Sequence, residues 1–189
     1  MPSAFLVGAG IFLSRLAGLV RLRVFAYYFG LQSDAADAFN AAFRIPNFLQ
    51  NLFGEGALSG SFIPVYAGLL ARGDRRQADR VAGAVGALLA LAVSIIVLIG
   101  VVATPALITI VAPGFVDDKR ALTIRLVRIL FPGTGLLVLS AWCLGILNSH
   151  RKFLLSYAAP VVWNVAMIAT LIGWGARVDL PRLAVALAW

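Results

Sequence analysis

Polar side chains recur at helical spacing between Asp37 and Glu55, inside an otherwise apolar stretch. Successive members of this set are three or four residues apart, which places them on one face of a helix. The set comprises Asp37, Asn40, Arg44, Asn47, Asn51 and Glu55. Because a polar face at membrane depth cannot meet lipid, we expect it to look into a helix bundle or a water-filled cavity.

Arginine also interrupts the first apolar run of the chain, at Arg15, Arg21 and Arg23. Arg15 and Arg21 are six residues apart and do not share one face of a straight helix. A bend at Gly18, or a cavity wide enough for both, would bring them together. Arg23 lies nearest the end of the run and is interpreted as a residue that snorkels to the lipid head groups.

These cations outnumber the nearby acids. Within the first two apolar segments, Arg15, Arg21 and Arg44 are accompanied by only two acids, Asp37 and Glu55. An arginine at a membrane helix centre costs roughly 2.5–3.5 kcal/mol, so the excess calls for a ligand. Guanidinium groups hold phosphate bidentately, which predicts a cavity for an anionic lipid head group. The simpler alternative is internal pairing, with Arg44 bound to Asp37.

The amide side chains of the same stretch have two interpretations. Asn40, Asn47 and Gln50 could hydrogen-bond to sugar or amide groups of a ligand, or they could join neighbouring helices. The spacing alone favours neither.

The composition implies lipid as the main solvent of this chain. Of its 189 residues 61% are hydrophobic and 13% charged, whereas soluble domains are about a quarter charged. The net charge is +8, but a nucleic-acid-binding protein needs a soluble basic face, so we expect no nucleic-acid partner. Cys143 is the only cysteine, and no metal or cofactor site is expected. Without a nucleophile–base set or a carboxylate pair, we do not expect an enzyme.

Six apolar segments predict an all-α fold, a polytopic membrane helix bundle. Each complete segment supplies the ~20 residues that cross about 30 Å of hydrocarbon as a helix. They run roughly from Ala4 to Phe29, Asp37 to Leu70, Val81 to Val111, Leu122 to Leu147 and Leu154 to Trp174, with an interrupted sixth from Pro181. Kinks are expected at the prolines in or near these segments, namely Pro46, Pro64, Pro105, Pro132 and Pro160.

The charges of the loops predict the orientation. Four arginines lie between Ala71 and Arg80, and Arg151 and Lys152 lie two segments later. In the opposite loops basic and acidic residues nearly balance. By the positive-inside rule the arginine-rich loops are cytoplasmic, and the N-terminus with them.

Several runs of residues resemble one family of transporters. They are "SRLAGLVR", "DAFNAAFRIPNFLQNLFGEGALSGSFIPVY", "APGF" and "GILNSHRKF". They are similar to the N-terminal part of the MviN/MurJ-type lipid II flippases, within the multidrug/oligosaccharidyl-lipid/polysaccharide exporter superfamily. The resemblance covers essentially the whole chain.

This resemblance implies about fourteen helices in two six-helix lobes plus a C-terminal pair. Residues 1–189 would form the N-terminal lobe, with the sixth helix truncated and the second lobe absent. The implied function is to flip lipid II, the undecaprenyl-pyrophosphate-linked disaccharide-peptide, across the bacterial cytoplasmic (inner) membrane. Alternating access around a cationic cavity would carry the head group, with membrane lipids as the other partners.

The family's site residues transfer to this chain only in part. Its two arginines match Arg15 and Arg21, and its two acids match Asp37 and Glu55. Leu22 stands where an acidic residue is common, and Gln50 stands where arginine is frequent, so one head-group contact is expected to be lost.

The expected head-group contacts are Arg15, Arg21, Arg44, Asn47 and Gln50. The expected supporting polar residues are Asp37, Asn40, Asn51 and Glu55. Two other functions stay open: export of a different lipid-linked oligosaccharide, and a non-transporting membrane scaffold whose buried charges serve assembly only.

Overall fold

The computed structural model of the chain describes residues 2–30, 32–150 and 154–189, and its regular elements are all helices. In order they are α1 (Pro2–Phe29), α2 (Asp34–Gln50), the π-helix η1 (Asn51–Phe62), α3 (Ile63–Ala71), α4 (Arg75–Val111), α5 (Asp117–Ser149), α6 (Leu154–Trp174) and α7 (Leu180–Ala188). The predicted all-α class is therefore confirmed. Element α7 opens at the predicted start of the sixth segment.

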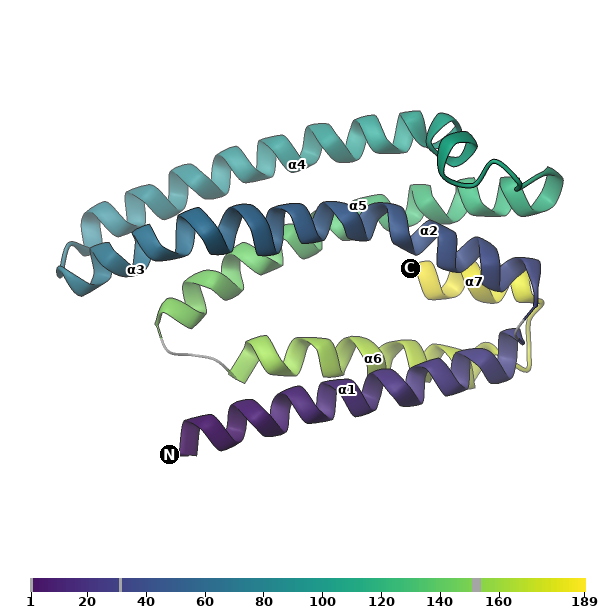
Figure 1. The fold of residues 1–189 in the computed structure, drawn as a ribbon, viewed down its shortest axis with the longest axis horizontal. Coiled ribbons are helices and arrows are strands. Elements are labelled where there is room, and N and C mark those ends of the chain that lie inside the picture. The colour runs from purple at the N-terminus through teal and green to yellow at the C-terminus, as the bar shows by residue number, and fades with distance from the viewer. Residues whose placement is uncertain (1, 31, 151–153) are drawn as a thin grey trace.

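The second predicted segment is one continuous rod built from α2, η1 and α3 (Figure 1). It begins at Asp34 rather than Asp37 because Ser33 caps it, with the Ser33 hydroxyl accepting the backbone N–H of Ala36 at 3.1 Å. Within the rod, η1 has the wider i→i+5 backbone bonding of a π-helix. The angular step between successive side chains therefore changes at Asn51.

Two later helices begin earlier than the apolar runs suggested. The helix expected from Val81 begins at Arg75, because the Asp74 carboxylate accepts the backbone N–H of Gln77 at 3.0 Å and caps the first turn. The helix expected from Leu122 begins at Asp117, with two acids in its first turn, where the helix dipole favours negative charge. Polar helix ends thus extend both segments beyond their apolar parts.

The prolines leave the helices unbroken. Helices α4, α5 and α6 continue through Pro105, Pro132 and Pro160 respectively. Likewise α1 is one continuous helix through Gly18.

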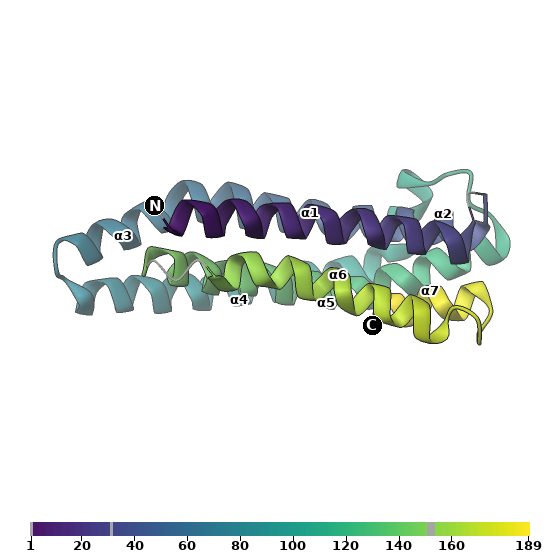
Figure 2. The same cartoon turned by 90° about the horizontal axis from the view of Figure 1, so that it is seen from below.

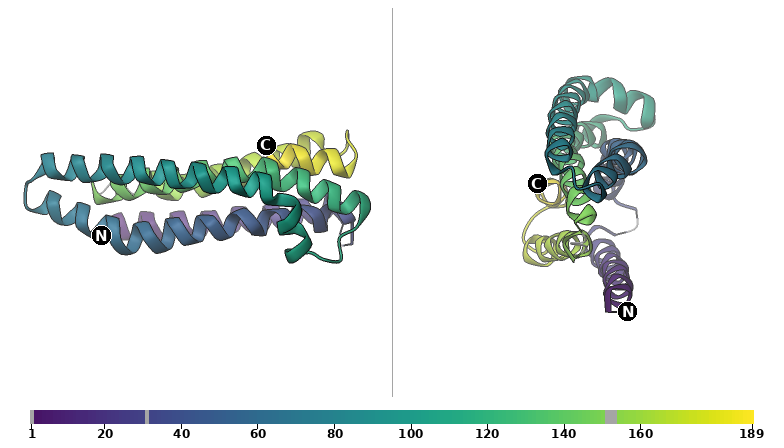
Figure 3. Two further views of the ribbon diagram at one scale, coloured as in Figure 1. Left: turned by 90° about the horizontal axis from the view of Figure 1, so that it is seen from above. Right: turned by 90° about the vertical axis from the view of Figure 1, so that its left-hand side faces the viewer.

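The helices form two groups. Helices α1 and α6 lie side by side along their length and run in the same direction (Figures 1 and 2). In the second group α5 packs against both α2 and α4, and an end-on view separates this group from the α1–α6 pair (Figure 3). Helix α7 contacts α2, α5 and α6 and so links the groups near one end.

The core is concentrated around α5. One buried cluster joins α2, α5, α6 and α7 through Phe39, Leu126, Phe131, Leu171 and Leu183. A second joins η1, α3, α4 and α5, with Leu58, Phe62, Tyr66, Leu89 and Val138 at its centre. Between α4 and α5 the backbones approach closely, since a Cβ on Gly100 would meet the Phe131 ring. Small residues commonly permit such contacts between membrane helices.

Helices α4 and α5 are long and apolar enough to cross a membrane. Large apolar side chains are exposed along α4, among them Leu88, Leu91, Leu98, Ile99 and Val102. An apolar outer surface of this kind suits a lipid surround. Length, composition and helical content together fit a membrane helix bundle.

Candidate functional site

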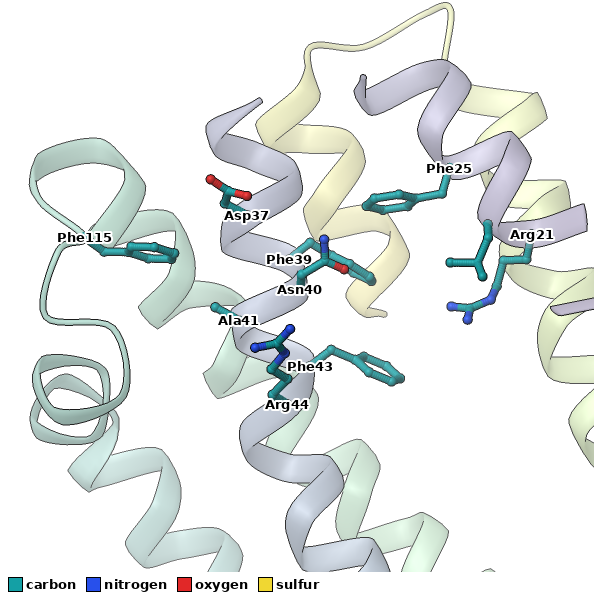
Figure 4. A pocket seen from close by; sticks show the side chains of 10 residues that line it. Arg21, Phe25, Asp37, Phe39, Asn40, Ala41, Phe43, Arg44 and Phe115 are labelled. Carbon is teal, nitrogen blue, oxygen red and sulfur yellow. The ribbon is translucent and has the colours of Figure 1, made fainter. Parts of the chain in front are cut away.

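A pocket of about 560 Å³ opens between α1 and α2, close to the loop that joins α4 to α5 (Figure 4). Its lining side chains come from three elements and include both charged and aromatic groups. They are Arg21, Leu22 and Phe25 of α1, Asp37, Phe39, Asn40, Ala41, Phe43 and Arg44 of α2, and Phe115 of the loop.

Arg21 enters the pocket from α1 (Figure 4). Its Nη1 donates to the Sδ of Met167 on α6 at 3.6 Å, a weak acceptor. Its Nε is buried and has no hydrogen-bond partner within the described residues. A half-buried guanidinium with unused donors and no carboxylate partner in the described chain is suited to receive an anion.

Arg44 reaches the same pocket from α2, with Asn40 one turn before it. Figure 4 shows the Arg44 guanidinium directed back toward Asn40 on the pocket side of the helix. In the described part of the chain Arg44 forms no ion pair, so the predicted alternative, a pair with Asp37, is not formed. Two guanidinium groups from different helices therefore share one pocket.

Phenylalanine rings form an apolar wall beside these cations. Phe25 and Phe39 have ring centroids 5.5 Å apart, and Phe39 and Phe43 have centroids 6.0 Å apart. Phe39 is almost fully buried. The Phe25–Phe39 contact joins α1 to α2, and the three rings give the pocket an aromatic side next to its cationic one.

Lys119 of α5 forms ion pairs with two aspartates at the edge of the pocket. Its Nζ lies 2.6 Å from Asp37 Oδ2 and 3.0 Å from Asp34 Oδ1. The same Nζ is 4.5 Å from the centroid of the Phe115 ring, within the range of a cation–π contact. The hydrogen bond to Asp37, followed by that to Asp34, raises the pKa of Lys119 above its ordinary value. Within the described chain the ion-pair partner of Asp37 is therefore Lys119 and not a pocket arginine.

The other predicted site residues lie elsewhere or outside the described side chains. Arg15 is exposed on α1, Asn47 is half-buried on α2, and Asn51 is exposed at the start of η1; none of the three lines the pocket. Arg23 is also exposed and outside it. The side chains of Gln50 and Glu55 are outside the part of the chain that the structure describes.

Sequence reasoning missed the aromatic wall and Lys119. Phe39 and Phe43 both border the pocket, although neither belongs to the polar face that helical spacing predicts. Lys119 sits in "APGFVDDKR", one of the stretches in which basic and acidic residues nearly balance. A lysine that directly follows two acids in the sequence carries no signal of a partner 82 positions away.

The polar groups that line the pocket are suited to hold an anion. They are two guanidinium groups, one amide and one carboxylate already held by Lys119. Such groups hold phosphate or pyrophosphate oxygens through charge-assisted hydrogen bonds, while the rings suit an apolar or sugar surface. Within the described residues no group of three or more His, Cys, Asp or Glu side chains is placed to hold a metal.

Comparison with known proteins gives one consistent result. The family model described as "Lipid II flippase MurJ" matches residues 25–189. A "Lipid II flippase MurJ" of Burkholderia cenocepacia is 35% identical over 179 residues, covering 94% of this chain and 34% of that protein.

Two proteins described as "Probable lipid II flippase MurJ" agree with it. That of Haemophilus influenzae is 36% identical over 184 residues, covering 93% of this chain and 36% of its own length. That of Vibrio cholerae is 37% identical over 198 residues, covering 100% of this chain and 37% of its own. The chain spans about a third of the length of these curated relatives.

Proposed function

Because this chain belongs to the lipid II flippase MurJ family, we propose that it forms one lobe, the N-terminal one, of a transporter that flips lipid II across the bacterial inner membrane. The family is one of multi-pass inner-membrane transporters and not of catalysts. The head group would be taken up by the pocket between α1 and α2 and carried by alternating access. The chain spans a third of its relatives' length, so the remaining wall of the cavity would come from a second lobe.

One observation carries this proposal: Arg21 and Arg44 enter one pocket from two helices, and neither has a carboxylate partner in the described chain. Lipid II presents a pyrophosphate between its lipid and its sugars. Two planar guanidinium groups match the oxygens of such a diphosphate. The phenylalanine wall beside them would lie against the sugars or the start of the isoprenyl chain.

The scaffold alternative predicts the opposite charge arrangement. A membrane bundle that uses buried charges only for assembly should neutralise them internally. The one multi-residue ion cluster in the described chain, Lys119 with Asp34 and Asp37, leaves both pocket arginines out. Unpaired arginines at a pocket favour a ligand-binding role.

We further propose that the N-terminus is cytoplasmic. The turn between α3 and α4, rich in arginine, lies toward the same end of the bundle as the N-terminus and the end of α5 (Figure 1). The positive-inside rule assigns that end to the cytoplasm. The pocket, at the opposite end near the α4–α5 loop, would then face the outer leaflet.

The test is binding of a short-chain lipid II analogue to the purified chain in nanodiscs. We expect saturable binding that weakens at least about tenfold when Arg21 and Arg44 are both changed to alanine, since each removes a charge-assisted contact. Arg23→Ala is the matched control, because Arg23 is exposed on the same helix and does not line the pocket. It should leave the affinity unchanged.

Three outcomes separate the alternatives. Equal binding by the double variant would place the head group elsewhere. Stronger binding of a lipid-linked sugar pyrophosphate without peptide would favour export of another oligosaccharide. Absence of binding, together with loss of folded protein in the arginine variants, would favour the scaffold.

A further inference from the structure

Asp37 is the acid in the lining of the pocket, and its choice of partner decides how much positive charge the pocket keeps. The charged lining residues are Arg21, Arg44 and Asp37. Asp37 and Arg44 lie seven residues apart, which is two turns along one face of α2. The Arg44 side chain already points toward that end of the helix (Figure 4). Arg44 therefore shares a helix face with Asp37 and is the pocket arginine that a free Asp37 carboxylate would attract, unless something else occupies that carboxylate.

Lys119 occupies it. The Lys119 ammonium donates to Asp37 at 2.6 Å and also lies 3.0 Å from Asp34. Lys119 is the least exposed member of the cluster, with 20% of its side chain exposed, against 53% for Asp37 and 80% for Asp34. Phe115, whose ring lies under the ammonium, also lines the pocket. Helix α5 thus delivers a fixed cation to the acidic first turn of α2.

The charge balance at the pocket depends on this cation. With Lys119 present, its ammonium and the guanidinium groups of Arg21 and Arg44 face two carboxylates, and one positive charge is in excess. Without the ammonium, two carboxylates face two guanidinium groups, which can then neutralise one another. A neutral pocket has little attraction for a diphosphate.

We propose that Lys119 is a positioning residue that holds Asp37 away from Arg44, so that both pocket guanidinium groups stay available for the phosphate groups of the head group. This inference rests on the proposed function for its ligand and on the ion cluster for its mechanism. Lys119 acts through Asp37 and does not contact the anion, because its ammonium is already turned toward two carboxylates and one ring.

A rescue experiment distinguishes this indirect role from direct contact. The probe is farnesyl pyrophosphate, titrated into the purified chain in nanodiscs. Lys119→Met should weaken binding about tenfold, the effect of one lost charge-assisted contact, and Lys119→Arg should largely retain it. Adding Asp37→Asn to Lys119→Met should restore near wild-type affinity, because the released carboxylate no longer competes for Arg44. If the double variant stays as weak as Lys119→Met, or if Lys119→Met binds normally, the proposal is wrong.

Arg182→Met is the matched control for loss of an exposed cation. Arg182 belongs to an ion pair with Asp179 at the start of α7, 3.3 Å long, and lies outside the pocket. Its replacement should leave the affinity for farnesyl pyrophosphate unchanged. Equal weakening by Arg182→Met and Lys119→Met would indicate a general field effect and would overturn the specific role of Lys119.

A second measurement needs no ligand. Phenylglyoxal modifies free guanidinium groups, and peptide mass spectrometry reports the rate at Arg44. Lys119→Met should slow modification of Arg44, and the added Asp37→Asn should restore it. If the wild type binds no lipid pyrophosphate, the proposed function is wrong. If the rate at which phenylglyoxal modifies Arg44 is the same in wild type and Lys119→Met, only this inference about Lys119 is wrong. If Lys119→Met does not fold, Lys119→Gln replaces it in both measurements.

Discussion

Lys119 of α5 donates a hydrogen bond to Asp37 of α2 at 2.6 Å, joining residues 82 positions apart at the edge of the pocket. Hydrogen bonds to Asp37 and to Asp34 raise the pKa of Lys119. A lysine whose folded-state pKa is raised contributes stability that is fully present below its unfolded pKa of about 10.4. That contribution is lost as the pH rises through the folded value.

The first prediction follows from the upward direction of this pKa shift. Between pH 7 and 9 the difference in melting temperature between wild type and Lys119→Met should be constant, and above about pH 10.4 it should shrink toward zero. Thermal unfolding in detergent across this range measures it. A difference that grows at alkaline pH would contradict the assignment of the ion pair.

The second prediction concerns the geometry of the cations. Arg44→Lys keeps the charge but removes the planar fork that binds two oxygens at once. We expect affinity for a short-chain lipid II analogue to fall about tenfold, near the lower end for a lost charge-assisted contact. Arg23→Lys, on an exposed residue outside the pocket, should change nothing. Full affinity in Arg44→Lys would mean that binding depends on the positive charge at this position and not on the planar guanidinium group.

The third prediction tests the α4–α5 contact. A Cβ on Gly100 would meet the ring of Phe131, which is only 2% exposed. Gly100→Ala should therefore destabilise the bundle by about 1–3 kcal/mol through overpacking. Gly83→Ala is the control on the same helix, since nothing lies within 4 Å of its added Cβ. Melting temperatures of the two variants should separate clearly, and equal values would contradict the packing.

The fourth prediction tests orientation. In intact cells a cysteine at Gly73 should be shielded from a membrane-impermeant thiol reagent, whereas one at Asp118 should react. The background needs Cys143→Ser, because Cys143 is free and exposed. The reverse labelling pattern would show that the bundle has the opposite orientation in the membrane, with the pocket toward the cytoplasm.

Local periodicity was enough to predict which side chains of α2 share the face that borders the pocket. Asp37, Asn40 and Arg44 were expected on one helix face because their spacing is three and four residues, and all three line the pocket. The apolar runs likewise predicted an all-α bundle, since lipid requires helices to satisfy their own backbone. The predicted face does not extend the pocket beyond Arg44, because Asn47 on α2 and Asn51 at the start of η1 both lie outside the lining.

Tertiary structure alone decided which charges meet. Sequence neighbours suggested Asp37 for Arg44, but α5 packs its first turn against that of α2 and supplies Lys119 instead. Arg21 and Arg15 share one unbroken helix, yet only Arg21 lines the pocket. Helix periodicity is a property of consecutive residues, so the amino-acid sequence determined the helices and their polar faces. The pairing of cations and acids depends on which helices pack together, and that is set by contacts between residues far apart in the chain.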